Sequence, residues 1–159
     1  MYGKLPVWLG TFEVKVEEMF HYTYLPIKLK YGKITVEPRL NPFLKLIYAC
    51  EEDFINSYSF SDYDEHYIYL TAKNLYQKEN CGFNREGWHT DSFGSEDINY
   101  IWSSNQPTIF NFSKFDISPC DERSMYEMSI QAKSENNLTH SNNSLLKLNQ
   151  YVVHKVGPI

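Results

Sequence analysis

The spacing of apolar and polar residues along the chain predicts a protein built mainly from short strands. Residues 11–16 alternate strictly, with Phe12, Val14 and Val16 on one face and charged side chains on the other. Such alternation is typical of a half-buried strand, because successive side chains of a strand point to opposite faces. Further strand candidates, rich in β-branched and aromatic residues, lie at 27–30, 33–37, 66–75, 98–103, 108–113, 145–149 and 151–156.

Two segments have helical patterns. Asn41-Pro42 offers an N-cap and a first-turn proline, and apolar residues recur near helical spacing behind it, which predicts a helix near 42–58. We expect this helix to pack on the outer face of a sheet. Residues 119–132 predict a short helix or a turn, and the polar stretches 59–65 and 134–144 predict loops. The expected fold class is therefore mainly β, within α+β.

Length and charge limit the function classes. The chain has 159 residues and a net charge of −5, so we expect one domain over 1–159 and no general basic surface for direct nucleic-acid binding. The sequence has neither a signal-peptide layout nor an apolar run long enough to span a bilayer, so we expect a cytoplasmic protein without a membrane partner. Cys50, Cys81 and Cys120 are widely spaced and predict reduced thiols.

His89 and Asp91 are the candidate site residues with the clearest chemistry. Residues two apart on an extended segment share a face, so both side chains can reach one metal ion. An imidazole and a carboxylate suit Fe(II), and a second, distant histidine would complete a two-histidine, one-carboxylate set. We favour His154, which lies in a β-branched run, over His140, which lies in a polar loop, because a packed strand fixes a ligand better.

Three stretches carry a resemblance to a known family: residues 84–91 (NREGWHTD), 97–102 (DINYIW) and 148–156 (LNQYVVHKV). Together they resemble the 2-oxoglutarate/Fe(II)-dependent oxygenase superfamily, and more closely a group of small phage-type proteins with its double-stranded β-helix signature. The resemblance covers roughly residues 66–159. It implies a jelly-roll core over 66–159, with 1–65 adding N-terminal strands and one supporting helix. It also implies Fe(II) held by His89, Asp91 and His154, with 2-oxoglutarate as cosubstrate.

One part of the family pattern is missing. The superfamily usually holds the far carboxylate of 2-oxoglutarate with an arginine on the final strand, eight to ten residues beyond the second histidine, as a bidentate pair. This sequence stops at Ile159, before that arginine, so the resemblance implies a jelly roll that is incomplete at its C-terminus. Lys114, at the end of the 108–113 strand, is the favoured substitute, and Arg85 and Lys155 are alternatives.

These observations support functions of different classes. The first is an Fe(II)/2-oxoglutarate oxygenase that acts on an unknown substrate. The second is a catalytically inactive phage or mobile-element protein that binds and inhibits a host defence protein in the host cytoplasm. A third is a structural β-sandwich in which His89 and His154 never meet. An open sheet edge left by the missing strand would also favour a homodimer.

Overall fold

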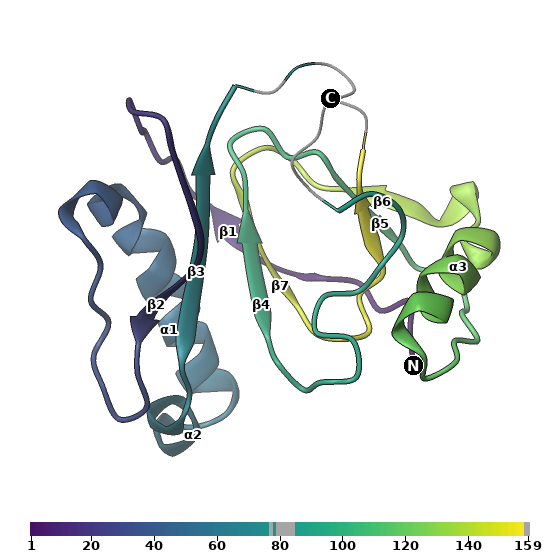
Figure 1. The fold of residues 1–159 in the computed structure, drawn as a ribbon, viewed down its shortest axis with the longest axis horizontal. Coiled ribbons are helices and arrows are strands. Elements are labelled where there is room, and N and C mark those ends of the chain that lie inside the picture. The colour runs from purple at the N-terminus through teal and green to yellow at the C-terminus, as the bar shows by residue number, and fades with distance from the viewer. Residues whose placement is uncertain (77, 79–84, 158–159) are drawn as a thin grey trace. The chain divides into compact units, whose positions relative to one another are not determined.

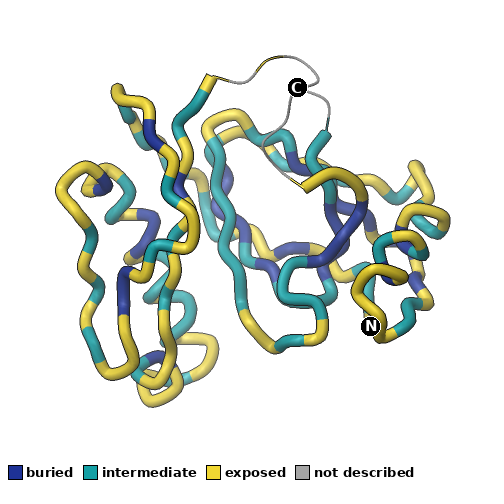
Figure 2. Tube along the Cα trace, in the orientation of Figure 1, coloured by how far each residue is buried: buried dark blue, intermediate teal, exposed yellow. Residues whose placement is uncertain are grey.

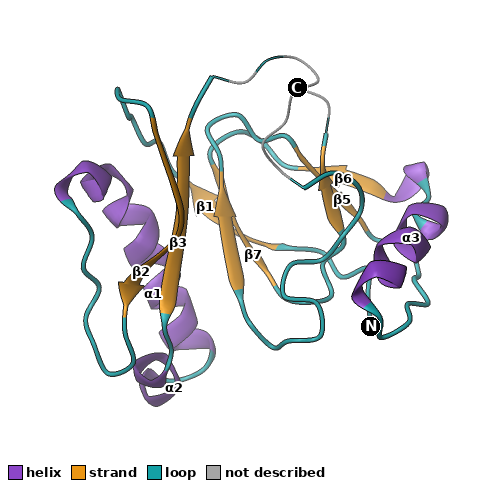
Figure 3. Cartoon of the chain, viewed as in Figure 1, coloured by secondary structure: helices purple, strands orange, loops and turns teal. Residues whose placement is uncertain are grey.

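The chain forms two compact units in the computed structural model, which describes residues 1–76, 78 and 85–157. One unit comprises Met1–Glu13 and Gln77–Ile159, and the other comprises Val14–Tyr76. Both contain antiparallel strands and few helices, so the architecture is mixed α+β (Figures 1 and 3). The single domain over 1–159 and its division at residue 65 stay predictions.

The first unit contains two three-stranded antiparallel sheets. One has the order β1-β7-β4, from strands β1 (Val7–Thr11), β7 (Ser144–Leu148) and β4 (Asn99–Trp102). The other has the order β6-β5-β8, from strands β6 (Asn137–Thr139), β5 (Thr108–Asn111) and β8 (His154–Val156). In the second sheet Phe110 lies opposite both Leu138 and His154, so β5 aligns the strand that carries the candidate ligand.

Two clusters of buried side chains hold this unit together. In the first, Phe110 of β5 packs with Leu146 and Leu148 of β7 and with Val152, so the two sheets share one apolar core. The second cluster contains Met128 of helix α3 (Asp121–Gln131), so this helix packs on the core of the same unit. The partners of Met128 in that cluster are Trp88, Phe115 and Val153. Most residues of β5 and β7 are buried, and Figure 2 marks the buried positions of the chain in dark blue.

The second unit is a two-stranded antiparallel ribbon with helices. Its elements are β2 (Phe20–Lys28), the 3₁₀ helix η1 (Pro38–Phe43), α1 (Leu44–Ser57), α2 (Phe60–Glu65) and β3 (Ile68–Asn74). Leu40 and Phe43 of η1 pack against Phe20 and Ala72, which face the same side of the ribbon. The apolar face of the ribbon is therefore covered within its own unit.

Several predicted elements are confirmed. The helix expected near 42–58 is α1, and the segment 119–132 contains α3, whose first turn carries Asp121 and Glu122, as the helix dipole favours. The strands expected at 66–75, 98–103, 108–113, 145–149 and 151–156 correspond to β3, β4, β5, β7 and β8. The strands β3, β4, β5 and β8 are shorter than expected, and β7 begins and ends one residue earlier than expected. The jelly roll stays a prediction, since the described strands form sheets of three, two and three strands.

Two segments that were predicted to be strands, 12–16 and 33–37, do not form strands. Residues 12–16 keep the expected alternation of exposure, but β1 ends at Thr11 and the Phe12 amide donates instead to the Asn143 carbonyl. Residues 33–37 also alternate without forming a strand, and of the expected 27–30 strand only Ile27 and Lys28 belong to β2. Alternation thus reports burial on one side, whereas a strand also needs a hydrogen-bonded neighbour.

The helix and loop predictions need three corrections. Asn41 is not the cap of α1, because the 3₁₀ turn from Pro38 already precedes that helix and contains Pro42. The stretch 59–65 is not a loop but contains α2, so α1 is not the only helix; Ser59 caps α2 by accepting a bond from the Asp62 amide. The stretch 134–144 contains a short 3₁₀ turn (Ser134–Asn136) and the edge strand β6.

Candidate metal centre

His89 and His154 lie side by side because their backbones form a reciprocal pair. The His89 amide donates to the His154 carbonyl at 3.0 Å, and the His154 amide donates to the His89 carbonyl at 2.9 Å. Residues that face each other across an antiparallel pair direct their side chains to the same side. The two imidazole centroids are accordingly 4.6 Å apart. The interpretation in which these histidines never meet is therefore wrong.

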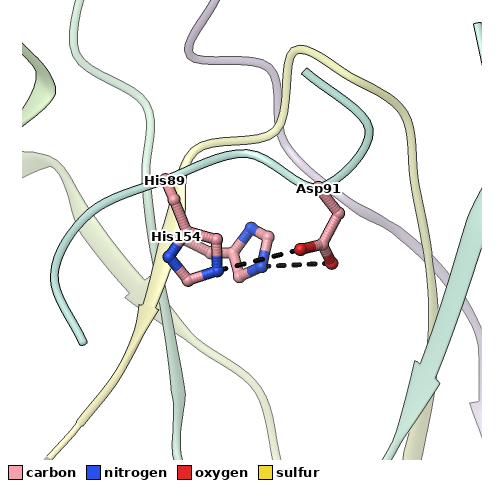
Figure 4. A group of neighbouring side chains, drawn as sticks. All are labelled: His89, Asp91 and His154. Carbon is pink, nitrogen blue, oxygen red and sulfur yellow. Dashed lines mark ion pairs between the residues drawn. The ribbon is translucent and has the colours of Figure 1, made fainter. Parts of the chain in front are cut away.

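Asp91 completes the group from two residues beyond His89. Its carboxylate Oδ1 lies 3.8 Å from His89 Nε2, and its Oδ2 lies 3.5 Å from His154 Nε2 (Figure 4). One ligand atom from each residue lies within 4.8 Å of those of the other two. Among the described residues, these three side chains form the one group of at least three histidine, cysteine or acidic residues that could hold a metal ion.

The hydrogen bonds of both histidines select the tautomer that a metal requires. His89 Nδ1 lies 2.9 Å from the Gly87 carbonyl, and His154 Nδ1 lies 3.0 Å from the Val152 carbonyl. A carbonyl oxygen only accepts, so each Nδ1 carries a proton, and in the neutral form of each ring the lone pair is on Nε2, the atom that faces Asp91. Such bonds also fix the ring orientation and make the imidazole a better ligand.

The surroundings shift the pKa values of His89 and Asp91 toward the forms that bind metals. Burial lowers the pKa of His89 below its ordinary value, and the neighbouring His154 lowers it further. Burial alone would raise the pKa of Asp91, but the hydrogen bond that a protonated His154 donates, the charge that either imidazole carries when protonated, and Arg85 outweigh burial, so this pKa is lowered. A neutral imidazole and an ionised carboxylate are the forms that coordinate a cation.

The group is closed on the histidine side and open on the aspartate side. The side chains of His89 and His154 are 9 % and 8 % exposed, whereas that of Asp91 is 36 % exposed. Trp88 and Val153, the residues directly before the two histidines, are buried together in one core cluster. Phe110 packs against the His154 ring, with centroids 5.9 Å apart. A ligand from solvent would therefore approach over Asp91.

The structure separates the other candidates from this group. His140 lies after β6 with its ring against Phe110, centroids 5.7 Å apart, and does not join the three candidate ligands. Lys114 lies beyond the end of β5 with an exposed side chain, and the described part of the chain gives it no hydrogen bond or ion pair to the group. Lys155 packs its ammonium over the Trp88 ring at 4.6 Å. Arg85 donates to the Thr90 carbonyl, between the two N-terminal ligands, at 3.2 Å.

Sequence reasoning missed the two carbonyls that orient the histidines. Gly87 and Val152 each precede their histidine by two residues. A backbone acceptor has no residue-type signature, so the sequence alone did not indicate these two contacts.

His140→Ala is expected to leave metal affinity within about twofold of wild type, since the residue lies outside the ligand group. The measurement is a Co(II) titration followed by the visible absorption of the bound ion. His140→Ala also removes an imidazole whose Nε2 is buried without a described partner, so folded stability should change little. Loss of metal binding in this variant would mean that His140, rather than His154, supplies the third ligand.

Comparison of the chain with known protein families, with curated proteins and with solved structures finds no match. Nor does any helix in the described part of the chain have the length and apolar character needed to cross a membrane. The superfamily resemblance therefore rests on the residues that carry it. The geometry contributes a buried His-Asp-His group that is compatible with an iron site.

Proposed function

We propose that this chain binds Fe(II) through His89, Asp91 and His154 and works as a 2-oxoglutarate-dependent oxygenase. The observation that carries the proposal is the convergence of three ligand atoms whose histidines are already held in the metal-binding tautomer. Two imidazoles and one carboxylate on one side of an iron leave its other positions free for small molecules. This donor set fits Fe(II) better than Ca²⁺ or Mg²⁺, which prefer ligand sets made of oxygen.

In this proposal the protein supplies position, exclusion of water and charge. Bound Fe(II) and 2-oxoglutarate would supply the oxidising chemistry, in which decarboxylation of the cosubstrate is coupled to oxidation of a substrate C–H bond by O2. His89 and His154 close the inner side of the site because their rings are buried. Asp91 contributes the one negative charge and faces the open side, where the cosubstrate and the substrate would enter.

Charge balance supports an anionic cosubstrate. A divalent ion bound to one carboxylate and two neutral imidazoles has a net charge of about +1. Arg85 adds a further positive charge close to the group, because its guanidinium is fixed on the Thr90 carbonyl and influences the pKa of His89 and Asp91. A dianion such as 2-oxoglutarate complements this charge.

Arg85→Met is expected to weaken 2-oxoglutarate binding to the Fe(II)-loaded protein about tenfold or more while leaving Fe(II) affinity nearly unchanged, because a guanidinium pairs a carboxylate with two hydrogen bonds. Lys114→Met is the matched variant, since the sequence favoured Lys114 for this role and its side chain is exposed. The measurement is anaerobic calorimetric titration with 2-oxoglutarate. If Lys114→Met loses the affinity and Arg85→Met keeps it, the sequence-based assignment of Lys114 is right.

The proposal is tested by anaerobic titration of the protein with Fe(II) and then 2-oxoglutarate, following the metal-to-ligand charge-transfer absorption of the chelated cosubstrate. We expect a band in the wild type and in His140→Ala but not in His154→Ala. Iron binding without this band would leave an iron protein that does not use 2-oxoglutarate. Binding of neither would contradict the proposal and favour the alternative, a catalytically inactive protein that acts by binding a host protein.

A further inference from the structure

The turn that carries Asp91 needs an anchor outside the sheets. Asp91 opens a turn in which the Ser95 amide donates to the Ser92 carbonyl and Ser92 has a positive φ of 56°. No described strand contains Asp91, so no ladder fixes its carboxylate as the backbone pair fixes the two histidines. One anchor of the turn is the bond from Asn99 Nδ2 to Ser92 Oγ at 2.9 Å.

The second anchor is Tyr2. Its ring stacks on Phe93, two residues after Asp91, with centroids 5.8 Å apart and an angle of 22° between the planes. Tyr2 and Phe93 both pack on the buried cluster that contains Trp88 and Val153. Those two residues directly precede His89 and His154. The Tyr2 ring thus contacts Phe93 and packs on the cluster that contains the residues directly before both histidines.

The same N-terminal segment also holds the turn before His154. The amides of Gly3 and Lys4 both donate to the Tyr151 carbonyl, at 2.9 and 3.2 Å. The Tyr2 ring meets the Tyr151 ring edge-on, with centroids 5.3 Å apart. The next residue, Val152, provides the carbonyl that orients the His154 imidazole. A shift of Tyr151 would therefore move the acceptor that sets the His154 tautomer.

Gly3 allows the close approach that places this segment. Its φ is +91°, and a Cβ at this position would lie 2.1 Å from the Ser113 carbonyl oxygen. Any larger residue would push the segment away from Ser113, because neither the backbone angle nor the space suits a side chain. The position of Tyr2 thus depends on a backbone contact that only glycine permits.

We propose that residues 2–4, which we call the N-terminal strap, are a positioning element of the metal centre, with Tyr2 joining the Asp91 turn to the Tyr151 turn before His154. This role of the strap depends on the metal centre of the proposed function, but not on which cosubstrate the protein uses. It acts through Phe93 and Tyr151, and no strap residue belongs to the ligand group.

The test is a Co(II) titration of the wild type, Tyr2→Phe, Tyr2→Leu and Gly3→Ala, read from the affinity and from the visible absorption bands of the bound ion. Tyr2→Phe keeps the ring and should bind Co(II) within about twofold of wild type. Tyr2→Leu keeps apolar volume but loses the stacked and edge-on ring contacts, and should bind at least about tenfold more weakly with altered bands. Gly3→Ala should resemble Tyr2→Leu.

Leu25→Ala is the control, because Leu25 packs on the core cluster of the unit Val14–Tyr76 and its truncation lowers stability, whereas both turns belong to the other unit. It should keep wild-type affinity and bands. Equal affinity and identical bands in Tyr2→Leu and the wild type would overturn the strap while leaving the metal centre intact. If the wild type itself binds no Co(II), both the strap and the proposed function are overturned, and the flat wild-type titration distinguishes this outcome from the first.

Discussion

Asp91→Ala is expected to weaken divalent-metal binding about 100-fold or more, which corresponds to about 2.7 kcal/mol. Asp91 is the one anionic member of the group, and its oxygens lie 3.8 and 3.5 Å from the two Nε2 atoms. Without it, a divalent ion would meet two neutral imidazoles and no compensating charge. The loss should exceed the tenfold to 100-fold effect typical of groups that only orient a ligand.

Two further substitutions separate charge from coordination. Asp91→Asn keeps an oxygen donor without the charge, so its affinity should fall between those of the wild type and Asp91→Ala. Glu96→Ala removes an exposed carboxylate from the same loop and should bind like the wild type. Anaerobic calorimetry with Fe(II), repeated with Co(II), provides the measurement. Wild-type affinity in Asp91→Ala would show that the carboxylate is not a ligand.

Metal addition gives an independent check of the same site. A ligand that binds only the folded state stabilises it by about 2.7 kcal/mol at a free concentration 100 times its dissociation constant. The wild type should therefore melt at a higher temperature with Co(II), and Asp91→Ala should not respond at the same concentration. An equal shift in both proteins would place the bound ion elsewhere.

The three candidate ligand residues could be named from the sequence, but the backbone pairing that brings them together could not be derived from local pattern. His89 and Asp91 are two residues apart, so a shared direction follows from local geometry alone. The partnership with His154 depends on the backbone pair between two distant segments, and no local pattern specifies that register. The role of the strap could not be predicted from the sequence, because nothing local distinguishes Tyr2 from other aromatic residues. Its contacts with Phe93 and Tyr151 appear only in the structure.

The fold follows the same rule: elements with a strong local pattern were predicted, whereas one that depends on distant pairing was missed. Helix α1 was predictable because its apolar spacing spans several turns, and β3, β4 and β5 were predictable from β-branched and aromatic runs. The strand β6 was missed because its three residues lie in an Asn- and Ser-rich stretch and pair with β5 at a distance in sequence. Helix α2 was missed although Ser59 and Asp62 match a capping pattern, which was a usable local signal.

Lys28 is the clearest case of a residue whose role lay outside the sequence pattern. As part of a short strand candidate it carries no sign of burial, yet it is 1 % exposed. Its ammonium donates to the carbonyls of Leu29 at 3.2 Å, Asp64 at 3.2 Å and His66 at 2.7 Å. The last two acceptors lie at the C-terminal end of α2, where helix carbonyls lack internal partners and the helix dipole favours a cation.

Lys28→Met is expected to lower the free energy of unfolding by about 2 to 3 kcal/mol, because the variant keeps the apolar stem and loses the charged donor. The Leu29 and Asp64 carbonyls would each keep a backbone donor, from Gly32 and Tyr31. The His66 carbonyl would lose the partner that the structure shows for it, and the cation 4.7 Å from the Tyr63 ring centroid would be lost as well. Most of the loss should therefore come from one orphaned carbonyl and one cation–π contact.

Urea unfolding followed by circular dichroism measures this difference, with Lys30→Met as the matched variant. Lys30 is exposed and its ammonium lies over the Tyr31 ring, so its replacement should change the free energy of unfolding by no more than about 0.5 kcal/mol. Metal affinity should be unchanged in both variants, because Lys28 and Lys30 belong to the unit Val14–Tyr76 and the three ligands belong to the other. If Lys28→Met is as stable as the wild type, methionine packing compensates for the lost hydrogen bonds, and the ammonium contributes no net stability at the end of α2.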